Sequence, residues 1–177
     1  MALILLRHGE PEVPRGVCYG QSDITAHIPG EDELQQLLSR LNGPVTRLHT
    51  SPLRRCRELA EELAPMLGLE VQADPRLSEI DFGRWEMKRW GDIPRAEIDL
   101  WAEDIEGARP HGGESVAQMV QRVSIYVTEI ANDQGDVLAV SHLGVARAMA
   151  AALRYADPYE LKLDFGDFLT FETDHIA

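Results

Sequence analysis

The sequence predicts an α/β fold with a mostly parallel sheet, and two observations support it. Strand and helix signals alternate through most of the 177 residues, as they do in consecutive βα units. The first apolar run, residues 2–6 (ALILL), does not alternate with polar residues, so it fits a central strand covered on both faces. The length suits a single hydrophobic core, and we expect one domain over residues 1–177.

A helix and a second strand follow in order. Residues 31–42 (EDELQQLLSRLN) space their leucines as one face of a helix does. Gly43 and Pro44 come next and stop that helix. Residues 45–50 (VTRLHT) then predict the second strand.

The second predicted helix covers residues 51–68. We expect Ser51 as its N-cap, Pro52 at its first position and Gly68 near its end. Arg55 would then lie one turn into this helix. Because a helix N-terminus already favours anions, an arginine at this place strengthens the effect.

Residues 74–113 lack this regularity. They hold all three tryptophans, Trp85, Trp90 and Trp101, together with several glycines and prolines. We expect a loop with short helices, which forms an irregular side segment or lid rather than a second domain.

Regular patterns return in the C-terminal third. Residues 114–131 have helical spacing, and residues 136–142 (DVLAVSH) form an apolar strand that ends in a histidine. Residues 145–153 predict the helix after it. Residues 167–173 (DFLTFET) predict an edge strand.

Two of the predicted strands end in the same way. Residues 3–9 (LILLRHG) and 136–144 (DVLAVSHLG) each deliver a histidine, His8 and His142, followed within two residues by a glycine. Ligands bind at the carboxyl ends of strands in an open parallel sheet, so we expect the two imidazoles to face one another. A lone histidine is more often structural, and the pair together with Arg55 predicts an anion site.

Composition limits the classes of function. The formal net charge of -13 argues against binding to nucleic acids or anionic membranes, which requires a basic surface. Only Lys88 and Lys162 among the 17 basic residues are lysines, so an anion site would be built from arginine. Cys18 and Cys56 are too few for a disulfide framework. Without a leader or a membrane-spanning run, we expect a cytoplasmic protein.

Five short motifs follow one another along the chain: LLRHGE (5–10), SPLRRC (51–56), LSEIDFGRWE (77–86), GGES (112–115) and VSHLG (140–144). In this order they resemble the histidine phosphatase superfamily, the phosphoglycerate mutase-like proteins. CYGQSD and DFGRWE are similar to its α-ribazole phosphatase-like branch. The resemblance implies a three-layer α/β/α sandwich with a mostly parallel central sheet, and a reaction through a phosphorylated histidine without a metal or other cofactor. Met87 departs from the pattern, since glycine is frequent after WE.

The resemblance also implies roles for individual residues. His8 would be the nucleophile, through its neutral imidazole. Arg7 and Arg55 would bind the non-bridging phosphate oxygens, and His142 would donate a hydrogen bond to the same group. Glu79 matches the family's acid, which protonates the leaving oxygen and then acts as a base toward water.

Further candidates lie on the expected substrate side. Asp81 is the alternative acid. Tyr19, Gly20 and Gln21 follow the first motif and are expected at the entrance, close to the leaving group, although polar residues beside glycine are just as often plain turn residues. Leu143 follows the second histidine and is expected to contact the substrate.

These features predict a metal-independent phosphatase for a small phosphorylated metabolite, with a phosphohistidine on His8 and α-ribazole 5'-phosphate as the best single substrate. The alternatives are phosphoryl transfer of the phosphoglycerate mutase type and a non-catalytic module that binds a phosphorylated ligand. A metal-dependent hydrolase would place two arginines next to a divalent cation, which they would repel. The sequence leaves open whether the chain forms a homodimer.

Overall fold

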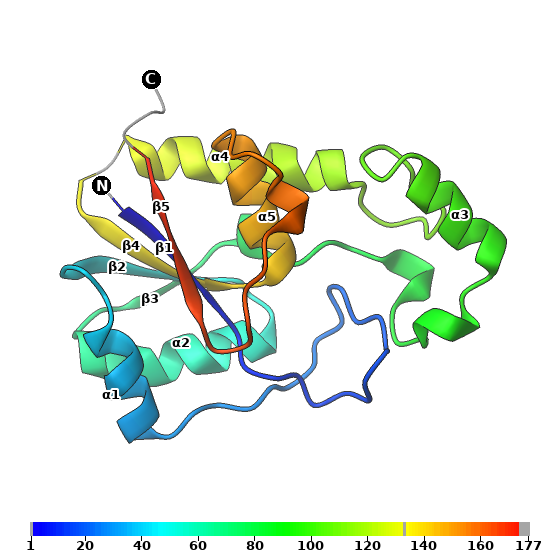
Figure 1. Ribbon diagram of the computed structural model, residues 1–177. Helices are drawn as coiled ribbons and strands as arrows, with labels where there is room; N and C mark the ends of the chain where they lie inside the picture. The colour runs from blue at the N-terminus through cyan, green and yellow to red at the C-terminus, as the bar shows by residue number, and fades with distance from the viewer. Residues whose placement is uncertain (1, 133, 174–177) are drawn as a thin grey trace.

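A central five-stranded sheet organises the computed structural model, which describes residues 2–132 and 134–173. The strand order is β3-β2-β4-β1-β5 (Figure 1). The first four strands along the chain run parallel, and the fifth pairs antiparallel with the first at one edge. The strands are β1 (Ala2–Arg7), β2 (Val45–Thr50), β3 (Val71–Ala73), β4 (Asp136–Ser141) and β5 (Phe168–Glu172).

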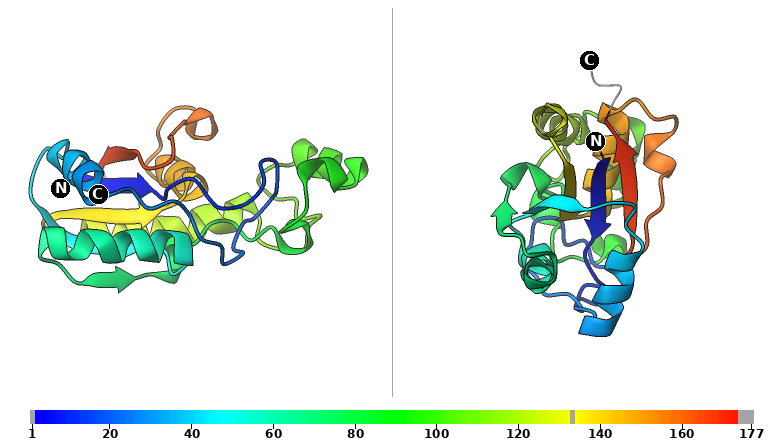
Figure 2. Two further views of the ribbon diagram at one scale, coloured as in Figure 1. Left: turned by 90° about the horizontal axis from the view of Figure 1, so that it is seen from below. Right: turned by 90° about the vertical axis from the view of Figure 1, so that its left-hand side faces the viewer.

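Helices cover both faces of this sheet (Figure 2). α1 (Glu31–Ser39) and α2 (Arg54–Leu67) pack on one face, and α4 (Val116–Ala131) and α5 (Leu143–Ala152) pack on the other. The predicted three-layer α/β/α sandwich with a mostly parallel sheet is therefore confirmed. Within the described residues, no helix combines the length and the apolar character that a membrane crossing requires.

β1 shows why the sheet is covered on both sides. Leu3 and Leu5 belong to the core under α4 and α5, whereas Ile4 and Leu6 belong to the core under α1 and α2. Successive side chains of a strand point to opposite faces, so an unbroken apolar run fits a strand between two layers. All four side chains are buried.

The second helix begins later than predicted. Ser51 follows the last residue of β2, and its backbone N–H donates to the Val140 carbonyl oxygen of β4 (2.9 Å). Leu53 also remains extended, with φ -67° and ψ 135°, and α2 starts at the residue after it. The predictions of Ser51 as N-cap and Pro52 as the first helical residue are therefore wrong. Gly68 does end the helix, in the left-handed conformation with φ 66°.

Two smaller differences concern short pieces of chain. α1 ends at Ser39, although residues 31–42 predict a longer helix. β3 has no counterpart in the prediction, because three residues are too few to show a period. Its position is fixed by parallel pairing with β2.

The irregular segment over residues 74–113 consists of three short 3₁₀ turns and one α-helix, α3 (Arg95–Glu103). α3 projects beyond the end of the sheet at which the parallel strands finish (Figures 1 and 2). Trp85 packs with Cys18 and Ile93 in a small core of its own. The segment thus forms a side wall next to the strand ends, and its movement as a lid stays a prediction.

Candidate active site

β1 and β4 end side by side and bring two histidines together. Arg7 lies opposite Ser141 in the parallel pair, so the next residues of the two strands are His8 and His142. Their ring centroids are 5.1 Å apart at an interplanar angle of 64°. The backbone N–H of His8 donates to the Ser141 carbonyl oxygen (3.0 Å). Two distant stretches with matching ends therefore meet at one point, as predicted.

Hydrogen bonds fix the tautomer of the His8 imidazole. Nδ1 lies 2.7 Å from the Gly9 carbonyl oxygen, and because a carbonyl can only accept, Nδ1 carries the proton. Nε2 is then unprotonated, and it accepts a hydrogen bond from Nε of Arg55 (3.3 Å). The lone pair of the imidazole thus faces a guanidinium group.

Both imidazoles are held in their neutral form. His8 is 1% exposed, and burial together with the nearby Arg55 and Arg7 guanidinium groups lowers the pKa of His8 from 6.5 to about 3. Burial and Arg55 likewise hold the pKa of His142 well below its ordinary value. At neutral pH, Nε2 of His8 therefore stays unprotonated, and its lone pair accepts the Arg55 hydrogen bond.

The loop after β1 holds Arg55, which lies in the first turn of α2. Nη1 of Arg55 donates to the Ser22 carbonyl oxygen (2.9 Å), and Nη2 donates to the Gly20 carbonyl oxygen (2.6 Å). Gly20 adopts φ 34°, and a Cβ at this position would lie 2.3 Å from Oε1 of Glu86. The loop therefore requires glycine here. Gly20, predicted at the entrance, thus also orients the Arg55 guanidinium group.

Arg7 lies against Phe165. Its guanidinium carbon is 3.7 Å from the centroid of the Phe165 ring, and its Nη1 donates to the Leu163 carbonyl oxygen (2.6 Å). Burial lowers the pKa of Arg7. Its buried Nε has no hydrogen-bond partner among residues 2–132 and 134–173. Such an unused donor fits an anion in the site.

Phe165 also lies next to His8, with ring centroids 5.6 Å apart. Phe165 is 39% exposed, whereas His8 is almost completely buried. No sequence motif points to Phe165.

Glu79 is oriented by two backbone donors. The N–H of Ile80 donates to Oε1 (2.9 Å), and the N–H of Gly144 donates to Oε2 (3.3 Å). A Cβ at Gly144 would lie 2.0 Å from Oε1, so glycine makes room for the carboxylate. Asp81, the alternative acid, accepts from the N–H of Gly83 instead (2.7 Å) and does not line the neighbouring cavity.

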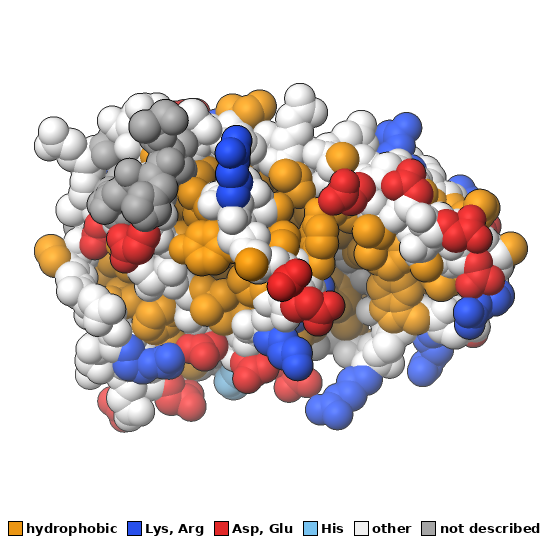
Figure 3. Space-filling view, turned by 45° about the horizontal axis from the view of Figure 1, so that its top comes forward, with side chains coloured by type: hydrophobic (Ala, Val, Ile, Leu, Met, Phe, Trp, Pro, Cys, Tyr) orange, Lys and Arg blue, Asp and Glu red, His pale blue; other side chains and the backbone are white. Residues whose placement is uncertain are grey.

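A cavity of about 490 Å³ lies between the strand ends and the side segment. The polar residues of its lining are Arg7, Tyr19, Glu79, Arg147, Tyr159 and Glu160. Figure 3 shows hydrophobic side chains around a hollow between the body of the molecule and the α3 end. The hydrophobic lining includes Phe82, Trp90, Trp101, Ile105, Val116, Val120 and Leu143.

Three of the residues predicted on the substrate side, Tyr19, Gly20 and Leu143, line this cavity. Gln21 has a different contact, because its side-chain amide donates to the carbonyl oxygen of Glu79 (2.9 Å). The Gln21 side chain thus supports the backbone that carries the carboxyl group.

The hydroxyl group of Ser51 contacts the imidazole of His142. Its Oγ lies 2.9 Å from Nε2 of His142, and Sγ of Cys56 lies 3.5 Å from the same nitrogen. The hydroxyl that the sequence suggests as a helix cap is thus a partner of this imidazole. In the described part of the chain, no three His, Cys, Asp or Glu side chains gather where they could hold a metal ion.

Known proteins share this combination of fold and motifs. The family model of the histidine phosphatase superfamily (branch 1) matches residues 3–167. Adenosylcobalamin/alpha-ribazole phosphatase of Escherichia coli K12 is 31% identical over 160 residues, covering 86% of this chain and 79% of that protein. Phosphoserine phosphatase 1 of Hydrogenobacter thermophilus is 32% identical, covering 99% and 83%. The structure of a mycobacterial glucosyl-3-phosphoglycerate phosphatase superposes with a TM-score of 0.79 at 26% identity, covering 96% of this chain and 88% of its own.

Proposed function

Because the chain belongs to the histidine phosphatase superfamily, branch 1, we propose that it is a metal-independent phosphatase that hydrolyses a small phosphomonoester through a phosphohistidine on His8. The observation that carries this function is the neutral His8 imidazole, whose Nε2 lone pair lies beside Arg55 and next to His142. A phosphomonoester carries negative charge that repels nucleophiles. A catalyst must therefore neutralise that charge and align the nucleophile with the leaving group.

In the first step, Nε2 of His8 attacks phosphorus, and the P–N bond forms as the bond to the ester oxygen breaks. Glu79 gives its proton to that oxygen, so the leaving group departs as an alcohol. The proton on Nδ1 remains on the ring, where the Gly9 carbonyl oxygen accepts its hydrogen bond. This bond stabilises the positive charge of the phosphorylated imidazole.

In the second step, water attacks the same phosphorus. Glu79 takes a proton from the water, the P–N bond to His8 breaks, and inorganic phosphate leaves. Arg7 and Arg55 counter the charge on the non-bridging oxygens in both steps, and His142 donates a hydrogen bond to one of them.

The cavity next to Glu79 supports α-ribazole 5'-phosphate as the substrate. Its wall is mostly hydrophobic and includes the indoles of Trp90 and Trp101. A benzimidazole nucleoside presents a planar apolar group to such a wall. The leaving group of phosphoserine carries two charges, for which the lining offers only Arg147 and Glu160 besides Arg7 and Glu79. The relative from Escherichia coli that is named for α-ribazole phosphatase activity supports the same substrate.

Phosphate release from a panel of phosphomonoesters tests both parts of this function. We expect kcat/KM for α-ribazole 5'-phosphate to exceed that for phosphoserine by ~100-fold, which corresponds to roughly 2.7 kcal/mol. His8→Ala should abolish turnover of every compound and remove the acid-labile phosphoenzyme.

The role of His8 and the identity of the substrate are tested separately. Unchanged turnover by His8→Ala would exclude His8 as the nucleophile. A preference for another phosphomonoester would exclude only α-ribazole 5'-phosphate as the substrate. Interconversion of phosphoglycerates without phosphate release would favour the mutase alternative.

A further inference from the structure

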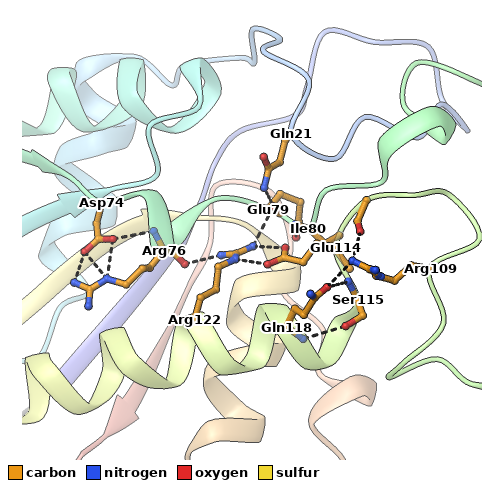
Figure 4. A network of polar contacts seen from close by, with 11 residues as sticks. Gln21, Asp74, Arg76, Glu79, Ile80, Arg109, Glu114, Ser115, Gln118 and Arg122 are labelled. Atoms are coloured by element: carbon orange, nitrogen blue, oxygen red, sulfur yellow. Dashed lines mark hydrogen bonds and ion pairs between the residues drawn. The ribbon is translucent and has the colours of Figure 1, made fainter.

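Arg122 connects α4 to the stretch of chain that carries Glu79. Its Nη1 donates to the Arg76 carbonyl oxygen (2.6 Å), and its Nη2 donates to the Glu79 carbonyl oxygen (3.2 Å) (Figure 4). We propose that Arg122 is a positioning residue, which holds the carboxyl group of Glu79 at the ester oxygen of the substrate. This role depends on the acid function proposed for Glu79.

A bidentate ion pair fixes Arg122 itself. Nε of Arg122 lies 2.7 Å from Oε1 of Glu114, and Nη2 lies 2.8 Å from Oε2. The two side chains are 20% and 16% exposed, so bulk water screens the pair only in part. The planar guanidinium fork matches both carboxylate oxygens at once, which an ammonium group cannot do. The ion pair therefore fixes the orientation of the Arg122 side chain, unlike that of a mobile arginine on the surface.

Gln21 holds the same point of the backbone from another element. Its amide donates to the carbonyl oxygen of Glu79 (2.9 Å), so this oxygen accepts hydrogen bonds from α4 and from the loop after β1 (Figure 4). A carbonyl oxygen has two lone pairs, and both are used here. Ile80 and Gly144 hold the carboxylate at the other end of the residue. Glu79 is thus fixed at its main chain and at its side chain.

The surroundings of Glu79 explain why such support is needed. Glu79 lies between two short 3₁₀ turns and outside every strand and α-helix of the described chain, so regular structure does not fix it. Proton transfer requires donor and acceptor within about 3 Å, and a misplacement of about 1 Å can cost ~100-fold in rate. By binding the carbonyls of both Arg76 and Glu79, Arg122 stiffens the stretch between them.

Leaving-group dependence separates this role from a general structural one. p-Nitrophenol leaves as a weak base and needs little protonation, whereas an alkyl alcohol needs a full proton. Arg122→Lys keeps the charge but loses the planar fork. It should lower kcat/KM, which reports only the steps up to departure of the leaving group, by about 30-fold for an alkyl phosphate but less than about threefold for p-nitrophenyl phosphate. Arg109→Lys is the matched control: Arg109 belongs to the same network but bonds Gly113 and Gln118, so both rates should stay unchanged.

Glu79→Gln tests the premise. Glu79→Gln should lower activity on the alkyl phosphate more than on p-nitrophenyl phosphate, and by a larger factor than Arg122→Lys does. The double variant Glu79→Gln with Arg122→Lys should be no less active than Glu79→Gln alone. The positioning role alone would be overturned if Glu79→Gln remains selective while Arg122→Lys loses the same activity on both substrates. It would also be overturned if Arg122→Lys loses no activity on either substrate. An unselective Glu79→Gln would overturn the acid function and the positioning role together. If circular dichroism shows that Arg122→Lys does not fold, Glu114→Gln replaces it in the comparison of the two substrates. Glu114→Gln removes the ion pair and keeps Arg122, and the same selectivity is expected.

Discussion

Nε of Arg55 lies 3.3 Å from Nε2 of His8, the atom proposed to attack phosphorus. The other two nitrogens of the guanidinium group are bound to the Ser22 and Gly20 carbonyl oxygens, so the arginine cannot swing freely. A phosphoryl group that enters here meets the lone pair and the countercharge at the same place. The proposed nucleophile and the positive charge proposed to neutralise the phosphate are therefore preorganised together.

Arg55→Lys should lower kcat/KM by about 100-fold even though it preserves the positive charge. An ammonium group cannot contact His8 and two carbonyl oxygens in the geometry of a planar fork. Initial rates with p-nitrophenyl phosphate measure the effect. Arg57→Lys is the control, because Arg57 lies exposed on the same helix, and its rate should change less than twofold. A near-normal rate for Arg55→Lys would contradict the preorganised pair.

The buried imidazole of His8 should make stability depend on pH. Its pKa is about 3 in the folded protein against ~6.5 in an unfolded chain, so below pH ~6.5 only the unfolded chain gains this proton. The free energy of unfolding therefore does not depend on this group above pH ~6.5. Between pH ~6.5 and pH ~3 it falls by up to about 1.4 kcal/mol for each pH unit that the solution is acidified. Burial of His142 acts in the same direction.

Urea denaturation at about pH 7, 6 and 5 measures this dependence. The free energy of unfolding should fall more steeply with decreasing pH in the native sequence than in His8→Gln, which removes the titrating group. Slopes rather than absolute stabilities are compared, because the substitution also changes packing. Parallel slopes would show that the His8 imidazole is not held neutral.

Gly144→Ala should impair the proposed acid without unfolding the protein. The new Cβ would lie 2.0 Å from Oε1 of Glu79, so the carboxylate must move, and a shift of about 1 Å can cost ~100-fold in kcat for a poor leaving group. Gly91→Ala is the control, since its Cβ would meet no atom within 4 Å. Full activity of Gly144→Ala on alkyl phosphates would show that the observed carboxylate position is not the catalytic one.

Trp90→Ala should change substrate preference through the cavity wall. We expect kcat/KM for α-ribazole 5'-phosphate to fall about 10- to 30-fold, because apolar contact with the leaving group is lost, while the value for phosphoserine changes less than about threefold. Leu100→Ala is the control, because Leu100 is exposed on α3 and does not line the cavity. Equal effects on both substrates would separate Trp90 from leaving-group recognition.

Met87→Gly should stabilise the fold. Met87 has φ 62°, a left-handed conformation that costs a non-glycine residue about 1–2 kcal/mol, and its side chain is largely exposed. After the extra chain entropy of glycine is subtracted, the free energy of unfolding should rise by about 0.5–1 kcal/mol. The neighbouring Lys88→Gly, at a residue without positive φ, should lower it. Urea unfolding of both variants decides the sign.

Local patterns account for what the sequence could predict. The apolar runs of β1 and β4 indicated buried strands, and their shared histidine-glycine endings placed His8 and His142 at one edge, because parallel strands finish together. Helix signals located α2, and with it Arg55, although the predicted first turn begins two residues too early. Each of these features depends on residues that are neighbours in the chain.

The rest of the site depends on contacts between distant segments. Oγ of Ser51 lies next to His142 because β2 and β4 are neighbours in the sheet, and it also accepts from the N–H of Leu53, just before α2. Phe165 lies next to His8 from a loop before the last strand, and no motif marks it. Arg122 reaches Glu79 only because α4 packs beside that stretch. Residue type alone does not identify such partners.

The register of β1 and β4 has a consequence for how activity is lost. A slip of one residue in this pairing would turn Leu3 and Leu5 toward the core that Ile4 and Leu6 fill, and it would also part the two rings. The packing that fixes this register therefore also fixes the distance between the imidazoles, and buried central strands are among the last parts of a domain to open. Hydrolysis and the circular dichroism signal of the sheet should therefore be lost together on heating.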